Sequence, residues 1–127
     1  MKSIITTSDA PQPIGPYSQA ILSGNTLYTS GQIAIDPKGN RLVTDNIKAE
    51  TKQVMENLKA VLKAADMDFS FVVKATIFIS DMNNFSEINS VYGQYFDDAT
   101  APARETVQVA KLPKNVNVEI SVIAVKP

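Results

Sequence analysis

Two charged side chains stand at positions where they could act on a small organic acid. Arg104 opens a strand-like run directly after a Thr-Ala-Pro-Ala loop, and its planar guanidinium can bind a carboxylate through two parallel hydrogen bonds. Glu119 lies inside the apolar run 116–125, where a partly buried carboxylate can serve as a general acid or base. The pattern leaves a second interpretation open for each residue, namely an ordinary surface arginine and a solvent-facing glutamate on an alternating strand.

The residue types that are missing restrict this chemistry. The chain of 127 residues contains no Cys, no His and no Trp. Disulfides, a Cys/His zinc site, a thiolate nucleophile and a Ser-His-Asp triad are therefore excluded. Any catalysis must use carboxylates, Lys, Arg, Tyr, hydroxyl groups, backbone N–H groups and water.

The charge balance and the hydropathy bear on partners and location. Lys plus Arg total 12 and Asp plus Glu total 13, which leaves no basic surplus for a nucleic-acid backbone. No apolar run approaches the roughly 18–20 residues of a membrane span, and the opening residues are too short and too polar for a signal peptide. We predict one cytoplasmic domain over residues 1–127 that binds neither nucleic acid nor a membrane.

Hydrophobic periodicity predicts two helices. Over residues 46–65 apolar residues recur at spacings of three, four and seven, with Asp45 as the N-cap. The apolar stripe comprises Ile47, Val54, Leu58, Val61, Leu62 and Ala65, and the solvent face comprises Lys48, Glu50, Lys52, Gln53, Glu56, Lys59 and Lys63. A second helix is predicted at about 85–97, where Asn84 and Glu87 have the spacing of a capping box.

Alternating patterns and turn residues predict the strands of a single sheet. The strands are expected at 18–23, 26–33, 71–79, 104–110 and 116–125. The first two form a hairpin around Ser23-Gly24-Asn25, and Phe71, Val73, Ala75, Ile77 and Ile79 share one strand face. The order β-β-α-β-α-β-β predicts an α+β fold with both helices on one face of the sheet.

Two consequences follow from this arrangement. The last strand has apolar residues on both faces, so we expect oligomerisation to cover the sheet face that carries no helix. If the last two strands form a hairpin, Glu119 falls beside Gln108, and Arg104 and Glu119 then border one site.

Three further residues stand out by position, and each has a structural interpretation as well. Tyr17 ends the Pro-rich loop 10–17, where an aromatic ring covers a pocket or packs. Gly31 interrupts a strand-like run and indicates a bulge or a close approach to a ligand. Asn89 lies among apolar residues of the second helix, where it is a pocket residue or is simply hydrogen-bonded.

Taken together, the motifs resemble the RidA/YjgF family of small enamine/imine deaminases, along nearly the whole chain. The markers are Ala10-Pro11, Ile14-Gly15-Pro16-Tyr17-Ser18-Gln19-Ala20, Thr29-Ser30-Gly31-Gln32-Ile33, Lys74-Ala75-Thr76-Ile77-Phe78-Ile79-Ser80-Asp81-Met82, Asn89-Ser90-Val91-Tyr92, Pro102-Ala103-Arg104, Val107-Gln108-Val109-Ala110-Lys111-Leu112-Pro113 and Val118-Glu119-Ile120. The resemblance implies a chorismate-mutase-like α+β fold, with a mixed sheet and two helices on one face. It also implies a homotrimer with sites between subunits.

The resemblance also implies an activity and its residues. The family hydrolyses 2-aminoacrylate and related enamines or imines to 2-oxo acids and ammonia, without a metal or another cofactor. Arg104 corresponds to the arginine that binds the substrate carboxylate, and Glu119 to the acid that holds or activates water. Tyr17, Gly31 and Asn89 correspond to pocket residues. Thr106 stands where many bacterial relatives have Cys, so we interpret this position as pocket lining.

Two other functions remain open. The same Arg104 pocket would serve a protein that binds or senses small 2-oxo or carboxylic acids without turnover. A role in acting on RNA or inhibiting translation is ascribed to some relatives, but the net charge of −1 and the lack of a basic–aromatic patch argue against it.

Overall fold

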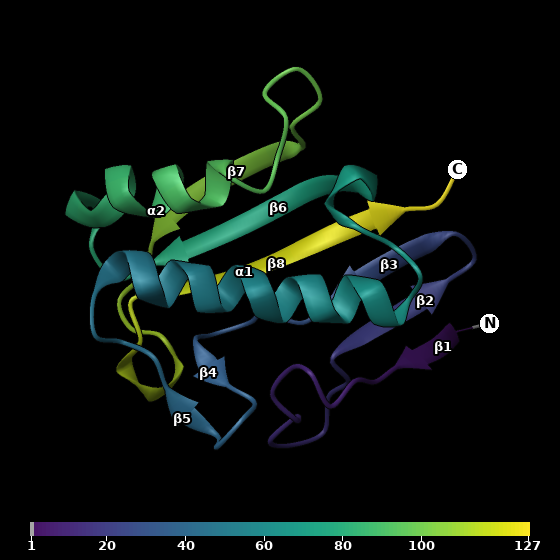
Figure 1. The fold of residues 1–127 in the computed structure, drawn as a ribbon, viewed down its shortest axis with the longest axis horizontal. Helices are drawn as coiled ribbons and strands as arrows, with labels where there is room; N and C mark the ends of the chain where they lie inside the picture. Colours follow the sequence, from purple (N-terminus) through teal and green to yellow (C-terminus); the bar gives the residue numbers. More distant parts are fainter. Residues whose placement is uncertain (1) are drawn as a thin grey trace.

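The computed structural model describes residues 2–127. A six-stranded mixed sheet carries two α-helices across one face, which confirms the predicted α+β arrangement (Figure 1). The elements are β1 Lys2–Ile5, β2 Ala20–Ser23, β3 Thr26–Thr29, β4 Ile35–Asp36, β5 Arg41–Leu42, α1 Ile47–Ala64, β6 Val72–Ile79, α2 Phe85–Gly93, β7 Ala103–Gln108 and β8 Val118–Val125. The short strands β1, β4 and β5 were not predicted. Within residues 2–127, no helix is both long and apolar enough to cross a membrane.

The order of strands in the sheet is β1-β2-β3-β8-β6-β7. The predicted hairpin of β2 and β3 is confirmed, but the hairpin of the last two strands is wrong because β6 lies between β7 and β8. The chain leaves β6, passes through α2 and returns as β7, which pairs with β6 in the parallel sense. Parallel neighbours require such a crossover connection. The strand β8 then enters on the other side of β6 and pairs with it in the antiparallel sense.

Helix α1 packs its predicted apolar stripe against the sheet. Val54, Leu58, Val61 and Leu62 are completely buried, as the periodicity predicted. The N-cap is Asn46 rather than Asp45, because the Asn46 side chain accepts a hydrogen bond from the backbone N–H of Ala49 at 2.8 Å.

The prediction that Glu50 faces solvent is wrong. Glu50 lies in the first turn of α1 and is fully buried. Its carboxylate accepts hydrogen bonds from the Asn117 backbone N–H at 2.7 Å, the Asn117 Nδ2 at 2.8 Å and the Val118 N–H at 3.2 Å. These donors replace the water that the carboxylate loses, and they attach the start of β8 to α1.

Helix α2 is shorter than predicted. It ends at Gly93 rather than near residue 97, and Asn84 makes no side-chain capping bond. Beyond the helix, Tyr95 and Phe96 still pack against the core, and the Phe96 ring centroid lies 4.8 Å from that of Tyr92 in α2. Packing therefore explains the apolar pattern that extended the prediction.

Strand β6 breaks the predicted alternation at its start. A β-bulge lies between Val72 and Lys74, so Val72 is buried whereas Val73 is 49% exposed. From Ala75 the alternation holds, and Ala75 and Ile77 point toward the helices as predicted.

The sheet face without helices carries apolar and polar side chains. Tyr28, Val107 and Val125 are exposed there, beside an ion pair of Lys74 and Glu105 at 2.7 Å. Exposed apolar residues on one sheet face are typical of an interface.

Candidate active site

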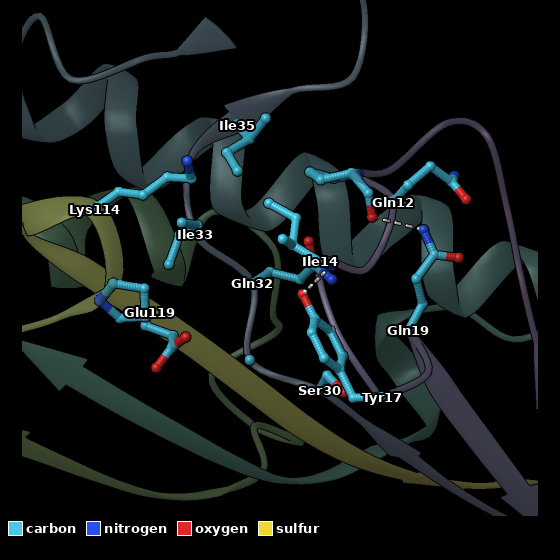
Figure 2. Close-up of a pocket in the computed structure, with 13 residues that line it drawn as sticks. Gln12, Ile14, Tyr17, Gln19, Ser30, Gln32, Ile33, Ile35, Lys114 and Glu119 are labelled. Atoms are coloured by element: carbon cyan, nitrogen blue, oxygen red, sulfur yellow. Dashed lines mark hydrogen bonds between the residues drawn. The ribbon is translucent and has the colours of Figure 1, made fainter. Parts of the chain in front are cut away.

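One cleft of about 460 Å³ opens between the N-terminal loop, the segment after β3 and the turn before β8. Its lining brings together three residues that the sequence singled out: Tyr17, Gly31 and Glu119. Figure 2 shows Tyr17 and Glu119 in this lining. The other lining residues are Pro11, Gln12, Ile14, Gln19, Ser30, Gln32, Ile33, Ile35, Pro113 and Lys114. The cleft thus combines an apolar wall with a single carboxylate.

Glu119 is held in this cleft by strand pairing. The chain after β3 bridges to β8, with hydrogen bonds between Gln32 and Ile120 at 2.8 and 3.1 Å. Val118 and Ile120 face the core, so Glu119 points to the face without helices and is partly buried. Burial raises the pKa of Glu119, because the charged form loses hydration. A carboxylate with a raised pKa is a stronger base than an exposed one, which favours a role in accepting and returning a proton.

Gly31 lies directly against this carboxylate. A Cβ atom at position 31 would lie 2.8 Å from Cδ of Glu119 and 2.9 Å from its Cγ and Oε2. The backbone of Gly31 has no positive φ, so the glycine is required by space rather than by conformation.

Tyr17 lies across the cleft on an exposed loop. The residue is 51% exposed, and its hydroxyl accepts a hydrogen bond from the Ile14 N–H at 3.3 Å (Figure 2). The base of the loop is fixed by Gln19, which is buried and donates to the Pro11 carbonyl at 2.9 Å. This attachment holds the aromatic ring beside the opening.

Arg104 lies in a different place. Its register partner on β6 is the buried Ala75, so its side chain points toward the helix face. There its Nη1 donates to Oδ1 of Asn89 at 2.7 Å, in a cavity of about 410 Å³. The cavity is lined by Asn89, Tyr92, Gly93, Phe96, Asp98, Ala101, Pro102 and Arg104.

Thr106 lies on the same face of β7 as Arg104. It is partly buried opposite Ile77, and its hydroxyl has no hydrogen-bond partner among residues 2–127. Thr106 lines neither of the two cavities described above.

The predicted site residues therefore form two groups within one chain. Tyr17, Gly31 and Glu119 lie together, and Asn89 and Arg104 lie together. The two groups lie on opposite faces of the sheet, on strands separated by β6, which alone spaces them by roughly 10 Å. The expectation that Arg104 and Glu119 border one site within a single chain is wrong, because it rested on the hairpin that β6 interrupts.

Sequence reasoning did not single out Ser30 and Lys114 among the residues that line the Glu119 cleft, and it missed the supporting residue Glu50. Ser30 precedes Gly31, and Lys114 lies in the turn before β8 with a left-handed φ of 55°. Glu50 supports the start of the strand that carries Glu119. The Lys-Asn turn was the available signal for Lys114, whereas nothing local distinguishes Glu50 from a surface residue. Within residues 2–127, no three His, Cys, Asp or Glu side chains could together hold a metal ion.

Comparison with known proteins finds relatives along nearly the whole chain. The family model described as Endoribonuclease L-PSP matches residues 7–126. A RutC family protein of Synechocystis is 52% identical over 98% of this chain and 96% of its own length. The 2-iminobutanoate/2-iminopropanoate deaminase of Bos taurus is 49% identical over 99% of this chain and 91% of its own.

Solved structures agree with the fold. The YjgF gene product of E. coli has a TM-score of 0.92 at 40% identity, covering 98% of this chain and 99% of that one. E. coli TdcF with bound serine has a TM-score of 0.92 at 42% identity and the same coverage. With the family model matching residues 7–126, the chain belongs to the RidA/YjgF family, whose members are also described as L-PSP and RutC proteins.

Proposed function

We propose that this protein hydrolyses reactive 2-aminoacrylate- and 2-aminocrotonate-type enamine/imine intermediates to 2-oxo acids and ammonia. The observation that carries the proposal is the 49% identity, over 99% of the chain, to a protein named 2-iminobutanoate/2-iminopropanoate deaminase. The partly buried carboxylate of Glu119 in its cleft supports it, because imine hydrolysis needs a group that accepts a proton from water.

The proposed reaction uses Arg104 and Glu119 in separate roles. Arg104 binds the substrate carboxylate and so positions the neighbouring imine carbon. Glu119 orients a water molecule and accepts its proton as the oxygen attacks that carbon. The nitrogen takes up the proton returned by Glu119, which gives a carbinolamine. As the C–N bond breaks, the carbinolamine hydroxyl gives up the second proton of the water to the nitrogen. Ammonia leaves, and a 2-oxo acid such as pyruvate or 2-oxobutyrate remains. An enamine is first protonated at carbon to give the imine.

Because Arg104 and Glu119 lie apart within one chain, the proposed reaction requires a site shared between two subunits. We propose a homotrimer in which the face without helices is covered and Arg104 of one subunit meets the Glu119 cleft of the next. The exposed apolar side chains of that face support the contact, and the number three follows from the family resemblance.

The activity is tested with a pyridoxal-phosphate dehydratase and serine or threonine. The dehydratase is kept in excess, so that hydrolysis of the released intermediate limits the appearance of 2-oxo acid. We expect the protein to accelerate this step, and Arg104→Ala and Glu119→Gln to abolish the acceleration. Arg41→Ala is the matched control, because Arg41 is the only other arginine of the chain and lies exposed on β5. An unchanged rate with the wild-type protein would refute the proposal.

The shared site is tested by mixing two inactive variants. After the subunits of Arg104→Ala and Glu119→Ala are exchanged at equal amounts, about a quarter of the inter-subunit sites would hold both wild-type side chains. Recovery of activity toward that level is expected. Failure to recover any activity, with exchange shown by mass spectrometry, would place both residues of each site in one subunit.

Binding without turnover is the second candidate function. It is favoured by the solved structure of E. coli TdcF with bound serine, which is 42% identical to this chain. Binding of serine or pyruvate by a protein that leaves the deamination rate unchanged would identify this function. Because the matching family model is described as Endoribonuclease L-PSP, RNA serves as a further control. Cleavage or salt-sensitive binding of RNA would contradict the prediction, made from the charge balance, that the protein does not bind nucleic acid.

A further inference from the structure

The guanidinium of Arg104 is held by three residues of α2. Asn89 Oδ1 accepts a hydrogen bond from Nη1 at 2.7 Å. The Arg104 Cζ lies 5.1 Å from the ring centroid of Tyr92 and 5.7 Å from that of Phe85, within the range of cation–π attraction. These residues are spaced four and three apart, so they form one stripe along the helix, facing β7.

The stripe is a rigid support. Tyr92 is only 5% exposed, and its ring packs on Phe96 with centroids 4.8 Å apart. Its hydroxyl has no hydrogen-bond partner among residues 2–127, so the contact to Arg104 is made by the ring. Arg104 itself lies on an edge strand and is exposed, where a long side chain would otherwise sample many rotamers.

We propose, on the basis of the function proposed above, that Phe85, Asn89 and Tyr92 form a cradle that positions the Arg104 guanidinium for the substrate carboxylate. Asn89 thereby acts through Arg104. Because Asn89 takes one N–H of Nη1, the remaining N–H groups keep the fork that binds a carboxylate bidentately. Ordering the side chain before binding lowers the entropy cost of capturing the ligand. Asp98 also lines this cavity, but within residues 2–127 it forms no ion pair with Arg104.

Nuclear magnetic resonance of the arginine side chains tests the cradle directly. The chain has two arginines, so Arg41 provides an internal reference for Arg104. In the wild type we expect the Arg104 Nε–H resonance to be displaced by the ring currents of Phe85 and Tyr92. Phe85→Leu and Tyr92→Leu should move it toward the Arg41 position, whereas Tyr92→Phe, which keeps the ring, should leave it in place.

Binding of pyruvate, measured by calorimetry on the same proteins, tests the consequence. Removing one ring contact, in Phe85→Leu or Tyr92→Leu, should weaken pyruvate binding by about 2- to 30-fold. Tyr92→Phe keeps the ring and should bind pyruvate as the wild type does. Phe85 is only partly buried, so Phe85→Leu remains informative if Tyr92→Leu does not fold.

The outcomes test the cradle separately from the proposed enzymatic function. An Arg104 resonance that does not move in Phe85→Leu would overturn the cradle, and so would a moved resonance with unchanged pyruvate affinity or a wild type that binds no pyruvate. A moved resonance with weakened binding supports the cradle even if the wild type does not accelerate deamination. That last combination would refute only the proposed enzymatic function.

Discussion

The contact between Gly31 and Glu119 leads to a quantitative prediction for Gly31→Ala. The added Cβ would lie 2.8 Å from Cδ and 2.9 Å from Cγ of Glu119, whereas unstrained carbon contacts are about 3.5–4.0 Å. The nearest atoms belong to the middle of the side chain, so moving the carboxylate tip alone does not relieve the overlap. The Glu119 side chain must rotate away from its place in the cleft.

The expected cost follows from this geometry. Overpacking costs about 1–3 kcal/mol, and partial burial lets Glu119 rotate, so we expect a loss of roughly 1–2 kcal/mol in the free energy of unfolding. If Glu119 is the general base, its displacement should also lower kcat/KM for deamination by about 10²- to 10⁴-fold. Urea unfolding at equal protein concentrations and the dehydratase-coupled assay measure the two effects.

A double-mutant cycle isolates the contact. In a Glu119→Ala background the obstructing atoms are gone, so Gly31→Ala should be close to neutral and the coupling energy about 1 kcal/mol or more. Gly93→Ala is the stability control: its Cβ meets no atom within 4 Å, and at the end of α2 it should stabilise by about 0.5–1 kcal/mol. An equal cost of Gly31→Ala in both backgrounds would refute the steric explanation.

Three further predictions concern the supporting structure and pH. Glu50→Gln places an amide N–H₂ against the N–H donors of Asn117 and Val118. We therefore expect the free energy of unfolding, measured in urea, to fall by about 2–4 kcal/mol. A decrease under about 0.5 kcal/mol would contradict the role of this buried carboxylate. Burial raises the pKa of Glu119, so the unfolded chain releases this proton at lower pH than the folded chain does. Stability therefore falls as pH rises from the ordinary value of 4.5 through the raised folded value, and Glu119→Gln should raise Tm at neutral pH but not below 4.5. Tyr92→Phe removes a buried hydroxyl that has no hydrogen-bond partner among residues 2–127. The free energy of unfolding should therefore stay equal or rise by up to about 1 kcal/mol, and Tm should follow it. A clear decrease in Tm would reveal a hydrogen bond of that hydroxyl.

Local features of this fold were predictable from the sequence. The stripe of α1 and the β2–β3 hairpin follow from residue spacing and turn residues, which act over a few positions. Errors of one or a few residues, as at the N-cap of α1 and the end of α2, arise because capping and packing compete at helix ends. The bulge at Val73 has no comparable local signal, because it depends on how β6 pairs with β8.

The candidate site also combines features that the sequence predicts with features that depend on tertiary structure. The residue types of Arg104 and Glu119 determined which chemistry is available, and the absence of Cys and His determined which is excluded. The placement of β6 between their strands, the approach of Gly31 to Glu119 and the burial of Glu50 were decided only by tertiary structure. Strand order depends on contacts between residues far apart in the chain, and alternation along one strand does not specify which strand lies beside it. For that reason the sequence alone determined the functional groups, whereas the fold decided that Arg104 and Glu119 point to opposite faces of the sheet.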